Sequence, residues 1–137
     1  LQSPGGSLFS GGLVFCNIID RIKNPLTITV LGHSFSMGIY ILMAGFNNPN
    51  VVKEAYPFSV GLLHGGDIQF NGSASQSKDF MEFNEKYEKM LKDYVLSHTK
   101  ITEEDYDKKW HKELFLTAED MLELGIIDRI IGQEEAI

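Results

Sequence analysis

Ser36 stands where a hydroxyl group could act as a nucleophile. It follows a short apolar segment and a glycine, and it opens a run of small and apolar residues that is typical of a buried helix. A serine at a sharp turn from strand to helix is exposed at the carboxyl edge of a sheet. The helix N-terminus adds unpaired N–H groups and a positive dipole end, which favour a developing oxyanion. This position therefore offers attack on a carbonyl carbon.

The alternative is that Ser36 only caps the helix, and its position alone favours neither interpretation. The next two residues, Met37 and Gly38, favour the catalytic one, because a bulky residue followed by a glycine lets the backbone pack closely.

Gly5 and Gly6 form a second candidate set of backbone donors. Glycines let a chain approach a substrate closely and point its N–H groups inward. Taken alone, this pair is better explained as an ordinary tight turn.

A serine hydroxyl is a weak nucleophile unless a base removes its proton. Of the four histidines, His64 is the best placed, because it ends an apolar strand that should reach the same sheet edge as Ser36. His33 precedes Ser36 too closely to reach its hydroxyl. We expect His98 to stabilise the end of a long helix and His111 to be solvated.

The base also needs an acid that orients it. The residues alone leave four candidates open, namely Glu113, Asp105, Asp107 and Glu119.

Composition limits the class of protein. The chain has 137 residues, of which 43% are hydrophobic and 23% charged, as in a single folded domain. Its net charge of −7 argues against nucleic acid and anionic membranes as partners. We expect no membrane span, signal peptide, metal site, P-loop or GxGxxG motif. The lone cysteine, Cys16, is expected to be buried in a helix.

Apolar periodicity predicts the elements of the first half of the chain. A stripe of Leu8, Gly12, Phe15, Ile18, Ile19 and Ile22 predicts an amphipathic helix over 8–23. We expect strands at 26–31, 51–55 and 58–64, and a buried helix at 36–46.

The second half contains a clear long helix, from about 75 to 97, whose apolar stripe runs from Phe80 to Val95 after a serine cap. An extended piece at 67–70 precedes it. A capping box at Thr102 and strands at 114–116 and 126–131 follow, the last after a helix that Gly125 ends. Alternating helices and strands predict an α/β domain with parallel strands and both sheet faces covered.

Five motifs then occur in the order of one known family. They are Ser3-Pro4-Gly5-Gly6-Ser7, Gly32-x-x-x-Ser36-Met37-Gly38, Leu62-Leu63-His64, Phe115-Leu116-Thr117-Ala118 and Gly125-Ile126-Ile127-Asp128. Through them the sequence resembles ClpP, the proteolytic subunit of the ATP-dependent Clp protease (peptidase family S14), nearly from end to end. The resemblance implies a ClpP/crotonase-like α/β fold with a protruding handle helix, the handle covering about 66–97.

The resemblance also implies roles for individual residues. Ser36 would be the nucleophile, His64 the general base and Glu113 the third member of the triad. Gly6 and Met37 would give the oxyanion-hole N–H groups. Substrate would bind as an added strand between the Gly5, Gly6, Ser7 and Leu8 segment and the Gly65 and Gly66 segment after the histidine.

The assembly implied by the family is a heptameric ring, in some cases doubled, that receives unfolded polypeptides from an AAA+ unfoldase, without a cofactor. We expect a cytoplasmic protein, or one of organellar or phage origin. We expect residues 1–137 to form one peptidase domain that lacks the family's N-terminal strands and axial loop, because Leu1 runs at once into the turn at Pro4.

Three departures from the family pattern support a second hypothesis. Glu113 stands where the family has aspartate, Leu114 where it has arginine, and Gly65 and Gly66 where it has Gln-Pro. In the family, the positions of Leu114 and of Gly65 and Gly66 belong to the contact between rings. The second hypothesis is a non-catalytic or weakly active subunit that assembles with an active partner. A third, an acyl-CoA-binding protein of the same superfold, is opposed by the pairing of Ser36 with His64.

Overall fold

The computed structural model describes residues 1–66, 68–109 and 113–133, which form a mixed α/β fold. The helices are α1 (Leu13–Arg21), which a π-helical turn (Leu8–Gly12) precedes, α2 (Met37–Met43), α3 (Ala74–Ser97), α4 (Glu103–Lys109) and α5 (Ala118–Glu123). The strands are β1 (Leu26–Val30), β2 (His33–Phe35), β3 (Val51–Ala55), β4 (Val60–Leu63), β5 (Leu114–Thr117) and β6 (Arg129–Ile130).

The strands form two three-stranded sheets, with the orders β1-β3-β6 and β2-β4-β5. In the first sheet all pairs are parallel. In the second, β2 and β4 are parallel but β4 and β5 are antiparallel. The expectation of parallel strands throughout was therefore wrong for β5, because the long excursion through α3 and α4 returns the chain in the opposite direction.

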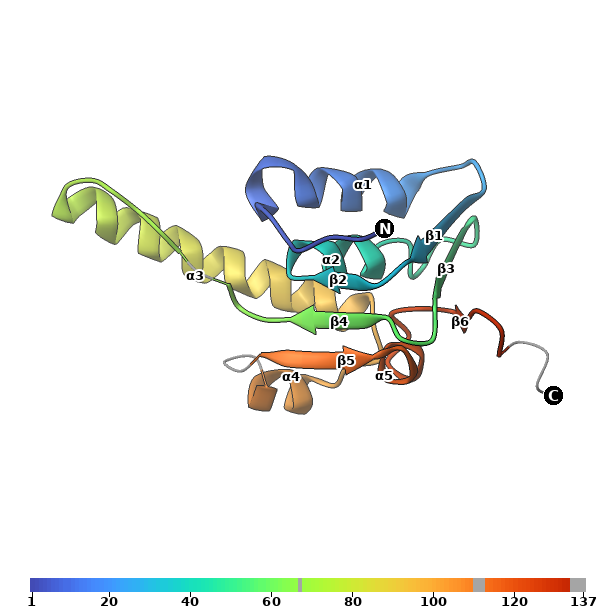
Figure 1. Ribbon diagram of the computed structural model, residues 1–137. Helices are drawn as coiled ribbons and strands as arrows, with labels where there is room; N and C mark the ends of the chain where they lie inside the picture. The colour runs from blue at the N-terminus through green and yellow to red at the C-terminus, as the bar shows by residue number, and fades with distance from the viewer. Residues whose placement is uncertain (67, 110–112, 134–137) are drawn as a thin grey trace.

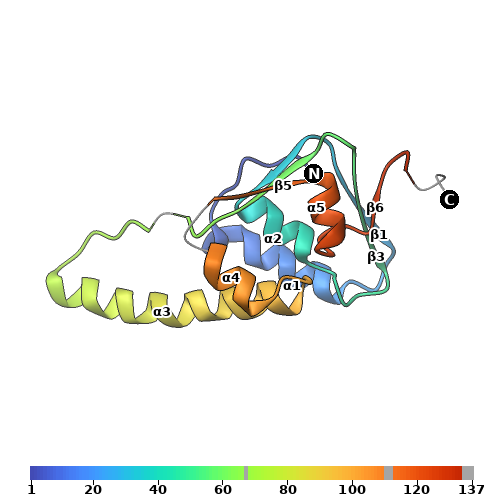
Figure 2. The ribbon, with the colours of Figure 1, turned by 90° about the horizontal axis from the view of Figure 1, so that it is seen from below.

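The helices form layers beneath the sheets. Figure 2 shows α2 and α5 directly under the strands, and α1, α4 and α3 farther from them. Because α2 is enclosed on both sides, five of its seven residues are buried. The N-terminal half of α3 extends past the rest of the molecule (Figure 1).

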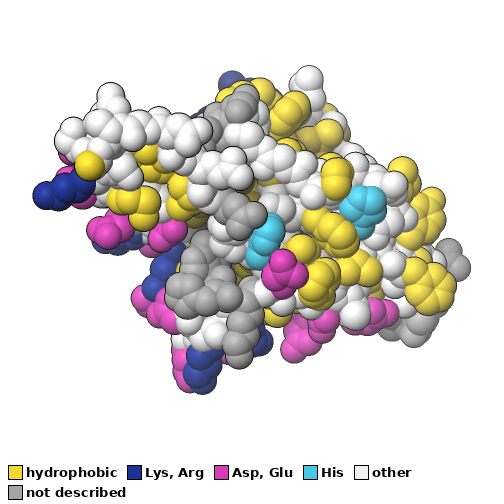
Figure 3. All heavy atoms as spheres, turned by 60° about the vertical axis from the view of Figure 1, so that its left-hand side comes forward, with side chains coloured by type: hydrophobic (Ala, Val, Ile, Leu, Met, Phe, Trp, Pro, Cys, Tyr) yellow, Lys and Arg dark blue, Asp and Glu magenta, His cyan; other side chains and the backbone are white. Residues whose placement is uncertain are grey.

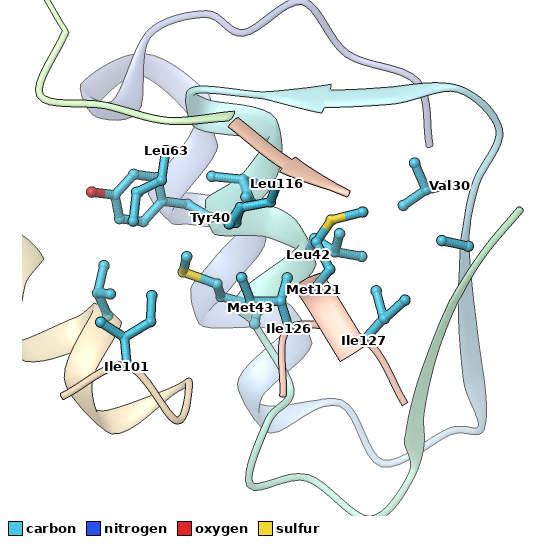
Figure 4. Close-up of a cluster of buried hydrophobic side chains, with 14 of the residues drawn as sticks. Val30, Tyr40, Leu42, Met43, Leu63, Ile101, Leu116, Met121, Ile126 and Ile127 are labelled. Atoms are coloured by element: carbon cyan, nitrogen blue, oxygen red, sulfur yellow. The ribbon is translucent and has the colours of Figure 1, made fainter. Parts of the chain in front are cut away.

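The core lies between α2, α5 and the strands that cover them. Figure 4 shows Leu42, Met43, Met121, Ile126 and Ile127 packed together, and each of them is at most 1% exposed. Burial of such side chains stabilises the fold by about 1.5–3 kcal/mol each.

The two predicted amphipathic helices are present, but only part of each apolar stripe is buried. In α1, Cys16 and Ile19 are buried as expected, whereas Phe15 and Ile18 are more than half exposed. In α3, Leu91 and Val95 are buried, but Phe83, in the projecting half, is 50% exposed. Helical periodicity finds an apolar face, but it does not say what packs on that face.

Other boundaries also differ from the expectations. The strand β2 was not predicted, and residues 68–70 form no strand. Asp67 and His111 lie outside the described residues. The predicted serine cap of α3 is Ser73, which forms a capping box with Gln76. At the predicted Thr102 cap, the N–H of Asp105 donates to the Thr102 hydroxyl at 3.2 Å. Thr117 and Asp120 form a further capping box at α5.

Lys53 of β3 is a buried cation, 1% exposed, whose Nζ lies 3.4 Å from the carbonyl oxygen of Met43. Burial lowers the pKa of Lys53 from 10.5 to about 8. Between these pH values the unfolded chain keeps a proton that the folded chain has released. The contribution of Lys53 to the free energy of unfolding should therefore rise with pH from 8 to 10.5, by at most about 1.4 kcal/mol per pH unit.

Urea unfolding between pH 7 and pH 10 tests this prediction, with Lys53→Met as the reference. The free energy of unfolding of wild type minus that of the variant should rise with pH, because the groups that both proteins share cancel in the difference. Parallel pH profiles for the two proteins would contradict it.

None of the helices that the structure describes combines the length and the apolar character that crossing a membrane requires.

Candidate active site

The first residues of the chain run along β1 and β2. The N–H of Leu31 donates to the carbonyl of Leu1 at 3.1 Å, and Ser3 exchanges hydrogen bonds with His33 and Phe35 at 3.0 and 2.9 Å. This pairing brings the following loop to the end of β2. Gly5 there has φ +107°, and a Cβ built on it would lie 2.9 Å from Ser36 Cβ. The loop thus passes directly beside Ser36.

Ser36 occupies a strained turn between β2 and α2. Its φ of 54° and ψ of −117° make it the one described residue other than glycine with positive φ. Such a conformation costs about 1–3 kcal/mol and occurs mainly at functional sites. Ser36 stands at the N-cap position of α2, yet its side chain forms no capping hydrogen bond. The hydroxyl therefore does not cap the helix. Capping was the alternative role that the position of Ser36 in the sequence had left open.

The strand register brings His64 to the same sheet edge. Phe35 of β2 is paired with Leu62 of β4, and the N–H of Ser36 donates to the Leu62 carbonyl at 2.8 Å. Since neighbouring strands are about 4.8 Å apart, the residue after β2 and the residue after β4 lie close together. Ser36 and His64 line one cleft. Among the described residues, no hydrogen bond joins their two side chains.

Glu113 lies opposite His64, at the end of the neighbouring strand β5. Leu63 is paired with Leu114 across the antiparallel β4–β5 ladder, so the next residues, His64 and Glu113, are also opposite each other. Nδ1 of His64 lies 3.9 Å from Oε1 of Glu113, which is longer than a hydrogen bond. The side chains are 27% and 63% exposed. Figure 3 shows a histidine and an acidic side chain adjacent on this face, beside hydrophobic side chains.

The expected oxyanion residues adjoin each other. A Cβ on Gly6 would lie 3.5 Å from Met37 Cε. Met37 is the first residue of α2, so its N–H belongs to the first turn, whose donors have no partner within the helix. The Met37 side chain in turn fills the space beside Gly12, where a Cβ would clash with Met37 Cγ.

A cleft of about 370 Å³ joins most of these residues. Seven of the residues expected at the site line it, namely Gly6, Ser7, Leu8, Ser36, His64, Gly65 and Gly66. Gly5, Met37 and Glu113 do not line it but adjoin residues that do.

The far wall of the cleft was not anticipated. It consists of Asn84, Tyr87, Glu88 and Leu91 of α3, with Tyr40 of α2. The spacing of the α3 residues, i, i+3, i+4 and i+7, places them on one helix face. The sequence contains this spacing, but Asn84 and Glu88 are polar and therefore did not belong to the apolar stripe that predicted the helix.

Three other residues considered in the sequence, His98, Asp107 and Cys16, serve structure. His98 Nε2 lies 3.2 Å from Asp20, and His98 Nδ1 lies 2.9 Å from the Tyr94 carbonyl at the end of α3. Asp107 pairs with Lys92 at 2.8 Å. Burial raises the pKa of the Cys16 thiol to about 11, so that this cysteine stays protonated and unreactive.

Replacing Gly5 with alanine should disturb the site selectively. The new methyl group would combine a positive φ with a 2.9 Å approach to Ser36 Cβ, so we expect a loss of about 1–3 kcal/mol in unfolding free energy and displacement of the loop. Thermal unfolding measures the first effect. In Gly11→Ala, where no atom lies within 4 Å of the new methyl, neither effect should appear. Equal stability of the two variants would refute the prediction.

Two comparisons with known proteins agree with each other. A family model described as Clp protease matches residues 1–134. The ATP-dependent Clp protease proteolytic subunit of Deinococcus radiodurans is 28% identical over 137 aligned residues, which cover 97% of this chain. The chain spans 63% of the length of that relative.

Proposed function

This chain belongs to the Clp protease family, and from that premise we propose that it is a serine endopeptidase subunit with Ser36 as nucleophile and His64 as general base. The observation that carries the proposal is the strand order β2-β4-β5, whose ends hold Ser36, His64 and Glu113 in that sequence. This is the order in which a nucleophile, a base and an orienting acid must stand.

In the proposed mechanism, Ser36 Oγ attacks a peptide carbonyl carbon while His64 accepts its proton. His64 then gives that proton to the leaving amine, and an acyl group remains on Ser36. Water, deprotonated by His64, releases the acyl group and restores the serine. The backbone N–H groups of Gly6 and Met37 hold the oxyanion in both steps.

Glu113 orients His64 and stabilises the imidazolium that forms. At 3.9 Å the carboxylate is short of a hydrogen bond, and a rotation of the exposed Glu113 side chain would close the gap. The polypeptide substrate binds in extended form along residues 5–8 and beside Gly65 and Gly66, which line the cleft or adjoin it.

For the whole protein we propose one peptidase domain over 1–137 with a ClpP/crotonase-like fold, in which α3 is the handle. The extension of α3 beyond the other elements supports this assignment (Figures 1 and 2). We further propose a heptameric ring, single or double, that takes unfolded protein from an AAA+ unfoldase in the cytoplasm or in an organelle.

The second candidate function is a non-catalytic or weakly active subunit in a mixed ring. It is favoured by the same 3.9 Å gap and by the 63% exposure of Glu113, which leave the acid loosely held.

Reaction of the assembled protein with a serine-directed phosphonate tests the proposal. We expect one adduct per subunit, mapped by mass spectrometry to Ser36, and the same adduct in Ser34→Ala. Ser34 is a matched control because it is buried two residues away, and its hydroxyl has no hydrogen-bond partner among the described residues. Absence of an adduct on Ser36 would refute the peptidase and favour the second candidate.

A further inference from the structure

The wall of the cleft that faces away from the sheets carries polar groups that the proposed chemistry does not use. They are the side chains of Asn84 and Glu88 on α3 and the hydroxyl group of Tyr40 on α2. Each of these residues lines the same cleft as Ser36 and His64, and none is needed to hold an oxyanion or move a proton. Their arrangement therefore bears on which substrate side chain the cleft accepts.

The Tyr40 hydroxyl is buried beside the cleft. Tyr40 is 1% exposed, and its Oη has no hydrogen-bond partner among the described residues. Figure 4 shows the hydroxyl pointing out of the cluster of buried hydrophobic side chains. Burial raises the pKa of Tyr40, so the group remains a neutral hydroxyl. An unpaired buried hydroxyl is unfavourable, and a polar ligand group in the cleft would supply the missing hydrogen bond.

Glu88 adds a carboxylate to the cleft. Its Oε1 accepts a hydrogen bond of 3.0 Å from Nδ2 of Asn84, a residue that is only 6% exposed, and this bond orients the carboxylate. Among the described residues no cation forms an ion pair with Glu88. Lys92, one helical turn away, is instead engaged by Glu103 at 3.0 Å and Asp107 at 2.8 Å. The charge of Glu88 is therefore left for a ligand.

We infer that the cleft selects a lysine or arginine side chain of the substrate, at the residue that precedes the cleaved bond, through the Glu88 carboxylate and the Tyr40 hydroxyl. Both substrate side chains combine a long aliphatic stem with a cationic hydrogen-bond donor. The stem suits the apolar lining supplied by Leu8, Ile68 and Leu91, and the volume of about 370 Å³ accommodates its length. This inference rests on the proposed function and specifies its substrate class.

Two fluorogenic peptides test the inference on the assembled protein. They differ only at the residue before the cleaved bond, which is lysine in one and norleucine in the other, so the difference between them is the charged group. Because Glu88 is exposed at the rim of the cleft, we expect kcat/KM to favour lysine by only about fivefold. Glu88→Gln should bring the ratio close to one. Tyr40→Phe should lower the ratio without lowering the unfolding temperature.

Glu85→Gln is the matched control, since it removes the same charge three residues away from a side chain outside this cleft. It should keep the wild-type ratio. A wild-type preference for norleucine, or a ratio that Glu88→Gln leaves unchanged, would overturn the inference.

Phosphonate labelling of Ser36 in the same samples separates the two claims. If Ser36 is labelled but lysine is not preferred, the inference fails and the proposed peptidase stands. If Ser36 is not labelled, the peptidase fails and the inference fails with it.

Discussion

Alanine at position 36 is expected to lower kcat/KM for peptide hydrolysis by about 10³- to 10⁶-fold. The hydroxyl of Ser36 forms no helix-capping hydrogen bond, so its removal should leave α2 and the unfolding temperature almost unchanged. Its strained backbone, with φ 54°, is more costly for alanine than it would be for glycine but no worse than for serine. The effect is therefore on chemistry, and steady-state kinetics beside thermal unfolding will measure it.

A double variant strengthens this test. If Ser36 and His64 act as one unit, Ser36→Ala combined with His64→Ala should be about as inactive as either single variant, because the second loss removes nothing further. Multiplied losses would mean that the two residues act independently. Hydrolysis by Ser36→Ala at more than about a tenth of the wild-type rate would rule out Ser36 as the nucleophile.

Glutamine in place of Glu113 is expected to lower kcat/KM by about 10²- to 10⁴-fold. The amide keeps the shape of the side chain but removes the negative charge that steadies the imidazolium of His64. Because Glu113 is 63% exposed, the same change should cost almost nothing in unfolding free energy. The expected result is a loss of kcat in a protein that unfolds like the wild type.

Two further variants show whether the position or merely an acidic charge matters. Glu119→Gln changes another exposed carboxylate, in the first turn of α5, and should keep full activity. Glu113→Asp should be partly active, because the shorter side chain must still span the gap that measures 3.9 Å for glutamate. If Glu113→Gln stays within about twofold of wild type, His64 does not depend on this acid.

Local signals predicted the helices well and the sheets less well. Ser73 and Thr117 begin α3 and α5 with side chains that bond residues three positions ahead, so a few neighbouring letters suffice to find them. The strand β2 has only three residues and no clear alternation. It exists because β4 and residues 1–3 supply hydrogen bonds to it, and these partners are distant or outside any local pattern.

The candidate site shows the same division. The residues alone pointed to Ser36 and His64 and left four acids open. The resemblance to a family selected Glu113, and the antiparallel pairing of Leu63 with Leu114 is what brings Glu113 opposite His64 in space. That pairing depends on the direction in which β5 returns after two helices, and no short window of sequence contains it.

The sequence by itself determined the helix periods, the caps, the buried cysteine and the family, because each depends on residue types at short or fixed separations. Tertiary structure alone decided which apolar faces are covered, as the exposed Phe83 and the buried Leu91 of one helix show. It also decided that Tyr40 and Glu88 line the cleft with Ser36. The physical reason is that burial and neighbouring charge are properties of packed surfaces, which form only when distant segments meet.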